Sequence, residues 1–173
     1  MLGVVISAQA TIIEYDVEQI SGKTWEYSYT VINHTSAPIV EFEILFDLGV
    51  YENLHKASAP SEWDPVVAQP DPNIPAAGFY DAMALWDEEI AAGETLGGFA
   101  VRFDFLGDGT PGSQLFNILD PSNFPVPLDS GTTQLAGTTL PAPVPEPATL
   151  LLSLLGIAAM VGAGRSLATP AQA

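Results

Sequence analysis

Three stretches of this chain alternate apolar and polar residues with a period of two, and this alternation constrains the fold more than any other feature. The stretches are 24–33, 39–47 and 99–106. A period of two predicts β-strands that bury one face and expose the other to water. The apolar positions are Trp25, Tyr27, Tyr29, Val31, Val40, Phe42, Ile44, Phe46, Phe99, Val101, Phe103 and Phe105. We expect the core to include Tyr27, Tyr29, Phe42, Ile44, Val101 and Phe103.

Weaker strand patterns cover 11–20, 79–87 and 113–119, and turn residues separate the runs. Ser21-Gly22-Lys23 is typical of a hairpin turn, and segments 34–38, 92–94 and 107–112 are rich in turn-forming residues. No part of the body shows an apolar stripe with helical spacing. The pattern therefore predicts an all-β domain over 11–133, an antiparallel, immunoglobulin-like β-sandwich.

The segment 58–78 holds five prolines, which favour an extended surface loop over a central strand. Trp63 lies within it. This side chain either plugs one end of the sandwich or offers a flat surface for a ligand, and the plug is the simpler interpretation. If the domain binds a glycan, the aromatic side chains that this region offers are Trp63, Phe79 and Tyr80.

The charge balance excludes several classes of function. The chain has 21 acidic and 4 basic side chains, a formal net charge of −17, and no cysteine. Nucleic acids need basic partners, so their binding is not expected. The two histidines have no neighbours at metal-ligand spacing, so we expect no metal and no cofactor. Asn33-His34-Thr35 matches a glycosylation sequon, which is a weak signal alone.

The sequence also names no catalytic group. No Gly-x-Ser-x-Gly nucleophile motif is present, and the densest acidic cluster, 87–89, is unremarkable in so acidic a chain. We therefore expect no enzymatic activity.

The two ends of the chain differ in composition from the body. Residues 1–10 end in a small-x-small triplet, so they are either a signal-peptide remnant or the start of a first strand. Residues 134–144 form a Thr- and Pro-rich linker. The charge-free run 148–164 follows, long enough as a helix for a short membrane span of about 26 Å. Arg165 comes directly after it.

The segment 145–173 resembles the PEP-CTERM sorting signal of exported bacterial proteins. The resemblance rests on Pro145, Glu146 and Pro147, the apolar run and Arg165, in that order. It implies export by the Sec machinery, a transient inner-membrane anchor at 148–164, and processing by an exosortase. It also implies release to the cell surface or an extracellular polysaccharide matrix. Arg165 stands where the family has a basic cluster.

Three functions fit these observations. The first is a non-catalytic surface or matrix protein with a structural or adhesive role, which predicts an apolar patch and no pocket. The alternative is a carbohydrate-binding module acting on exopolysaccharide, which predicts exposed aromatic side chains on one face or loop end. The second alternative is a small secreted hydrolase, which needs a cleft with convergent carboxylates.

Overall fold

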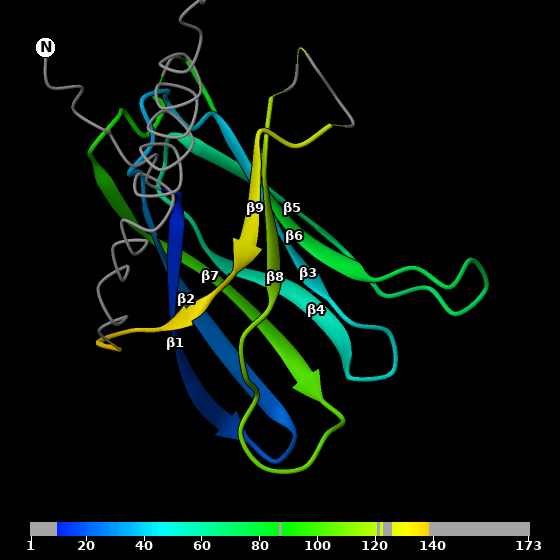
Figure 1. Cartoon of the computed structure of the whole chain (residues 1–173). Helices are drawn as coiled ribbons and strands as arrows, with labels where there is room; N and C mark the ends of the chain where they lie inside the picture. The colour runs from blue at the N-terminus through cyan, green and yellow to red at the C-terminus, as the bar shows by residue number, and fades with distance from the viewer. Residues whose placement is uncertain (1–9, 87, 121, 123–125, 139–173) are drawn as a thin grey trace, which may run out of the picture. The chain divides into compact units, whose positions relative to one another are not determined.

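The alternating stretches form the inner strands of two packed β-sheets (Figure 1). The computed structural model describes residues 10–86, 88–120, 122 and 126–138. Its strands are β1 (Ile12–Ser21), β2 (Thr24–Ile32), β3 (Glu41–Phe46), β4 (Tyr51–Ser58), β5 (Trp63–Ala68), β6 (Gly78–Ala84), β7 (Thr95–Phe105), β8 (Leu115–Leu119), β9 (Asp129–Thr132) and β10 (Gln134–Leu135).

Each sheet has five strands. Sheet 1 has the order β10-β1-β2-β7-β4, and sheet 2 has the order β5-β6-β3-β8-β9. The all-β sandwich predicted from the alternation is confirmed, whereas its immunoglobulin-like character stays a prediction. Pairing is antiparallel except between β1 and β10, which run parallel. The predicted hairpin is present, because Ser21 faces Thr24 and Gly22 has a φ of 53°.

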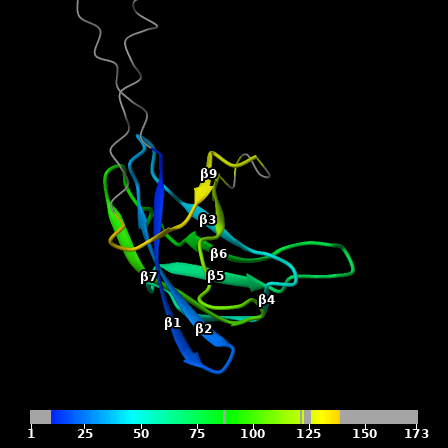
Figure 2. The same cartoon turned by 60° about the horizontal axis from the view of Figure 1, so that its bottom comes forward.

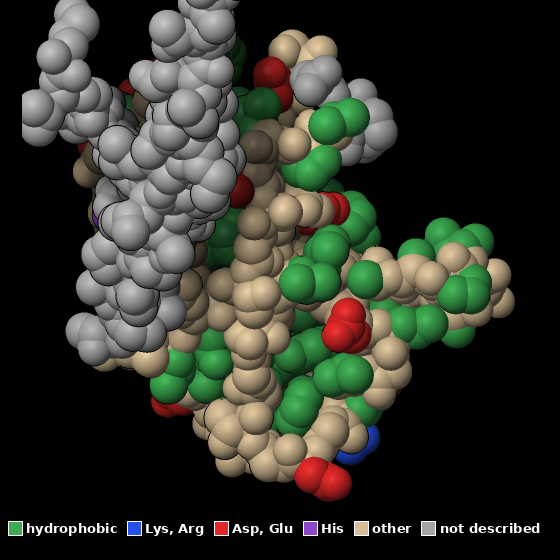
Figure 3. Space-filling model, in the orientation of Figure 1, with side chains coloured by type: hydrophobic (Ala, Val, Ile, Leu, Met, Phe, Trp, Pro, Cys, Tyr) green, Lys and Arg blue, Asp and Glu red, His purple; other side chains and the backbone are tan. Residues whose placement is uncertain are grey.

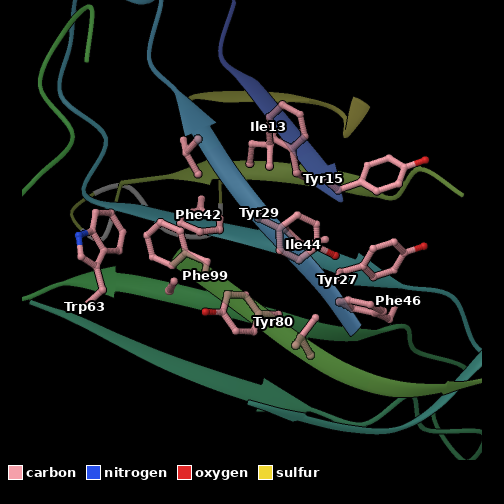
Figure 4. Close-up of a cluster of buried hydrophobic side chains, with 14 of the residues drawn as sticks. Ile13, Tyr15, Tyr27, Tyr29, Phe42, Ile44, Phe46, Trp63, Tyr80 and Phe99 are labelled. Atoms are coloured by element: carbon pink, nitrogen blue, oxygen red, sulfur yellow. The ribbon is translucent and has the colours of Figure 1, made fainter. Parts of the chain in front are cut away.

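Aromatic side chains fill the space between the sheets (Figure 4). Tyr27 stacks on Phe103 with ring centroids 4.7 Å apart, and Phe42 meets Phe99 edge-on at 4.9 Å. Such pairs add to the stabilisation that burial provides. All six core residues expected from the sequence are buried, which confirms that prediction: Tyr27, Tyr29, Phe42, Ile44, Val101 and Phe103. Trp25, Val40 and Phe105, also expected inward, are only partly buried.

One buried polar network crosses this apolar core. The Tyr29 hydroxyl donates to Oε1 of Gln114 at 3.2 Å, and the same oxygen accepts from the Thr133 hydroxyl at 3.2 Å. Burial raises the pKa of Tyr29 well above its ordinary value, so the hydroxyl keeps its proton and remains a donor. Gln114 thereby ties β2 to the segment before β10.

The segment 58–78 is not a single loop, which corrects the prediction. Residues Trp63–Ala68 form β5, an edge strand whose position tolerates Pro65 because an edge strand need not donate every backbone N–H. The part between β5 and β6 projects from the sandwich in both views (Figures 1 and 2). In Figure 3 this projection is largely covered by hydrophobic side chains, and Ile74 within it is 70% exposed.

The expected linker begins later than predicted. Gln134 and Leu135 pair with Glu14 and Tyr15 of β1, so residues 134–135 belong to the sandwich. The chain divides into two units, Met1–Thr138 and Thr139–Ala173, and all described residues lie in the first. Residues 139–144 of the linker and residues 1–9 of the N-terminal segment lie outside the described residues.

Candidate functional site

Three connections meet at one end of the sandwich. They are the β2–β3 segment after Ile32, the β4–β5 turn, and the long β6–β7 segment after Ala84. Backbone hydrogen bonds join them, since Leu85 N donates to Glu62 O at 2.8 Å and Ile90 N donates to Ile39 O at 2.9 Å. Backbone pairing of this kind holds irregular segments in place without a regular strand.

Asn33 fastens two of these connections from within. It is fully buried, and its Nδ2 donates to Ala37 O at 2.8 Å and to Ile90 O at 2.9 Å. Gly93 N donates in turn to Asn33 O at 2.7 Å. The side-chain nitrogen of the sequon is therefore occupied and inaccessible, and Asn33 acts as a structural brace rather than as a glycan acceptor.

The β4–β5 turn is positioned by a bulge in the neighbouring strand β7. Gly98 has a φ of 99°, a conformation that other residues rarely adopt, and the β2–β7 register shifts at this point. The Ser58 hydroxyl donates to Gly98 O at 2.9 Å, and Pro60 lies against Gly98. The bulge thus fixes where the turn with Pro60 and Glu62 leaves the sheet.

The β4–β5 turn, the β6–β7 segment and the first residues of β5 and β7 line a pocket of about 180 Å³ that is strongly acidic. Its polar lining includes Glu62, Glu88, Glu89 and Glu94, and the buried side chains of Trp63 and Ile90 belong to its apolar lining. No Lys or Arg is among the lining residues. The Ser61 hydroxyl donates to Glu62 Oε1, and this hydrogen bond holds the pKa of Glu62 below its ordinary value. The pocket therefore presents hydrogen-bond acceptors and negative charge.

Trp86 lies two residues before Glu88, which lines this pocket, and is almost completely exposed. Its side chain is 89% exposed, and its backbone φ is 56°, in the left-handed region that bulky residues avoid. Glu88 N donates to Leu85 O at 3.1 Å, so Trp86 lies on a tight turn whose next described residue lines the pocket. A strained backbone conformation is typical of functional positions, and here it carries a large apolar ring that is exposed to water.

The aromatic residues singled out from the sequence lie elsewhere. Trp63 is 4% exposed and packs against Phe99 at 5.2 Å and Phe42 at 5.8 Å, so it is the core plug that we considered simpler. Tyr80 is fully buried, and its hydroxyl donates to Ser58 O at 3.2 Å. Phe79 is half-buried on the outer face of β6. Trp63 and Tyr80 therefore present no exposed ring.

The other features predicted from the sequence are the C-terminal sorting motif, the membrane span and the absence of a metal site. The sorting motif Pro145, Glu146, Pro147 and Arg165 and the expected span 148–164 lie outside the described residues. Among the residues that are described, no helix is long and apolar enough to cross a membrane. In the same part of the chain, no three His, Asp or Glu side chains are grouped so as to hold a metal ion.

Comparison with known proteins yields structural likeness without sequence relatives. No family model and no curated protein matches the chain. Solved structures similar to it include the chitin-binding domain of Chi18aC from Streptomyces coelicolor, with 15% identity, a TM-score of 0.41, and coverage of 62% of this chain and 90% of that one.

A second similar structure is a family 3b carbohydrate-binding module from the biomass sensoring system of Clostridium clariflavum. It shares 13% identity, with a TM-score of 0.44 and coverage of 75% of this chain and 88% of that one. The module CBM3b from cellobiohydrolase 9A of Clostridium thermocellum shares 9% identity, with a TM-score of 0.41 and coverage of 66% and 82%. Values this low concern the β-sandwich architecture alone and say nothing of ligand or activity.

Proposed function

We propose that this protein is an exported, non-catalytic carbohydrate-binding protein whose glycan contacts lie at the end of the sandwich that carries Trp86. The observation that carries the proposal is Trp86 itself, 89% exposed in a left-handed backbone conformation beside an acidic pocket. Exposing an indole ring to water and straining its backbone both cost free energy. Such a residue is best explained by a ligand that covers the ring.

A sugar ring suits this arrangement. Its C–H face is apolar and packs on an aromatic ring, while its hydroxyl groups need hydrogen-bond partners. Glu62, Glu88 and Glu89 line the neighbouring pocket and accept such hydrogen bonds. A purely adhesive body was expected to lack a pocket, so the pocket favours carbohydrate binding over that role.

The charge of the site narrows the class of glycan. Four glutamates line the pocket, no basic residue joins them, and the whole chain has a formal net charge of −17. This field repels uronic acids and sulfated sugars and attracts cations. We therefore expect glycans of uncharged or amine-bearing sugars, with amine-bearing glycans losing affinity as salt is added.

The proposed cellular address rests on the C-terminal sequence. The resemblance of 145–173 to a PEP-CTERM signal supports export, a transient inner-membrane anchor, processing by an exosortase, and a final place at the cell surface or in a polysaccharide matrix. A glycan-binding body fits that address. Deleting residues 145–173 should release the exported protein from the envelope fraction, and unchanged retention would contradict this part of the proposal.

The binding experiment uses isothermal titration calorimetry with three probes: a neutral gluco-oligosaccharide, a glucosamine oligomer and a galacturonate oligomer. We expect binding to one or both of the first two and none to the third. Trp86→Ala should weaken binding about tenfold or more, the effect of removing a central aromatic contact.

The control variant is Ile74→Ala, which removes another exposed apolar side chain, 70% exposed, from a different loop. It should leave binding unchanged. Equal affinity of wild type and Trp86→Ala would overturn the proposed site. Cleavage of a probe during the titration, lost when a pocket glutamate is changed to glutamine, would replace binding by the hydrolase function.

A further inference from the structure

Three carboxyl groups that do not line the acidic pocket lie together on the outer face of sheet 2. Glu41 and Glu43 come from β3 and Asp81 from β6, and all three are half-buried. Glu43 and Asp81 are direct cross-strand partners, and Glu41 faces Met83, the next outward position on β6. Direct partners on one face lie roughly 5 Å apart at Cβ, and diagonal neighbours lie roughly 7–8 Å apart.

Within the described part of sheet 2, no cationic side chain compensates these carboxyl groups. The strands of sheet 2 contain no Lys, Arg or His, whereas Lys56 and Arg102 lie on strands of sheet 1 and Lys23 lies in its β1–β2 hairpin. Like charges placed directly opposite one another destabilise a strand pair. The outer face of sheet 2 therefore concentrates negative charge at its centre, and its strands carry no side chain of opposite sign.

The described side chains that surround these three carboxyl groups add no positive charge. From β8, Asn117 Nδ2 donates to Glu43 Oε2 at 3.1 Å. From β5, Val66 lies opposite Asp81 and the carboxyl of Asp64 lies opposite Met83. From β9, Ser130 lies opposite Asn117 and adds no charge. The one further titratable side chain that faces the cluster is thus another acid.

Two physical effects favour the neutral form here. Burial removes water from Asp81, and the neighbouring Glu41 and Glu43 repel a second and third negative charge. Together with a hydrogen bond to Glu41, they raise the pKa of Asp81 from 3.8 to about 7. A carboxyl group that stays protonated can donate a hydrogen bond to its neighbour, which two carboxylates cannot do.

We propose that Asp81, placed among Glu41 and Glu43, keeps a proton in the folded domain at weakly acidic pH, and that loss of this proton weakens the β3–β6 pair, so that mild acid stabilises the sandwich. The direction in which stability changes with pH follows from the protonation of Asp81 in the two states. An unfolded aspartate has lost its proton above about pH 4, whereas folded Asp81 keeps its proton until the pH passes about 7. Between these values the folded state binds more protons. The free energy of unfolding therefore falls as the pH rises from about 4 to about 7, and then levels off.

The test is chemical denaturation of the full chain at about pH 5 and about pH 8, which lie on either side of the proposed transition. Asp81→Asn keeps the shape of the side chain and removes the charge. We expect its denaturation midpoint to exceed that of the wild type at the higher pH, and to fall less between the two values. The matched control is Asp16→Asn, which removes one exposed charge from β1 in sheet 1.

The control separates this proton from the general repulsion within an acidic chain, because both variants change the net charge equally. Equal pH dependence of Asp81→Asn and Asp16→Asn would overturn the proposal. A carbon-13 NMR titration of the wild-type Asp81 carboxyl group decides the question if the variant does not fold. We expect its midpoint to lie near neutral pH, and a midpoint below about pH 5 would overturn the proposal as well.

Discussion

Trp63 lies on β5 opposite Ala84, and Trp86 follows two residues after Ala84, yet the surroundings of the two tryptophans are opposite. Trp63 is 4% exposed and packs edge-on against Phe99, whereas Trp86 is 89% exposed on a strained turn. Burial of Trp63 therefore stabilises the fold, whereas the exposed ring and strained backbone of Trp86 destabilise it. The difference teaches that a ligand can reach the exposed rim around Trp86 but not the core that holds Trp63.

The largest expected effect separates the two tryptophans by stability. Trp63→Ala removes a buried ring and should lower the free energy of unfolding by about 3–5 kcal/mol. Trp86→Ala removes an exposed ring and should change it by less than about 0.5 kcal/mol. Urea denaturation of both variants measures the two values. Similar losses in both would contradict the assignment of Trp63 to the core and Trp86 to the rim.

A smaller loss of stability is expected for a substitution of Asn33, which joins the connections at this end of the sandwich. Asn33→Ala removes the two hydrogen bonds that Asn33 Nδ2 donates to Ala37 O and Ile90 O, at a cost of about 1–3 kcal/mol for the pair. Because Asn33 braces the segment that carries Ile90 and Glu94, glycan binding should weaken as well, although Asn33 is not among the residues that line the pocket. Denaturation and calorimetry on the same variant check both effects. Unchanged stability would show that the brace is unimportant.

The smallest expected effect is a gain in stability, produced by Trp86→Gly. Glycine adopts a left-handed backbone conformation without strain, so Trp86→Gly should relieve a cost on the order of 1 kcal/mol and stabilise the domain slightly. The same variant should lose glycan affinity. Stabilisation together with lost binding would identify Trp86 as a residue kept for function. A destabilised Trp86→Gly protein would mean that the ring contributes to packing.

The alternation of apolar and polar residues predicted the inner strands correctly. It did not predict the strands in which a bulge or a proline interrupts the period of two. In β4, Tyr51 and Leu54 both point inward although they are three residues apart, because the β4–β7 register shifts and Asn53 has a φ of 55°. This bulge hides the strand from a search for alternation. β5 was hidden by Pro65, which only the edge position of the strand tolerates, and by the prolines on either side of it.

The site was harder to predict than the fold. Continued alternation along 79–87 would place Trp86 on the same face as the buried Tyr80 and Ala82. The strand ends at Ala84 instead, and the left-handed turn rotates the indole into water. The acids that follow Trp86 in the sequence were the available signal, because a run of charges marks where a buried strand must end. The candidate residues Trp63 and Tyr80 were chosen for their place near prolines, which did not reveal their burial.

The most direct test of the central claim observes the tryptophans separately while a glycan is added. The chain has three tryptophans, so a proton–nitrogen NMR spectrum contains three indole N–H signals that can be assigned by single substitutions. On titration with a glucosamine oligomer or a neutral gluco-oligosaccharide, we predict a saturable shift of the Trp86 signal. The Trp25 signal, from the partly buried ring on β2, should stay in place. A Trp86 signal that does not move with either probe would contradict the account.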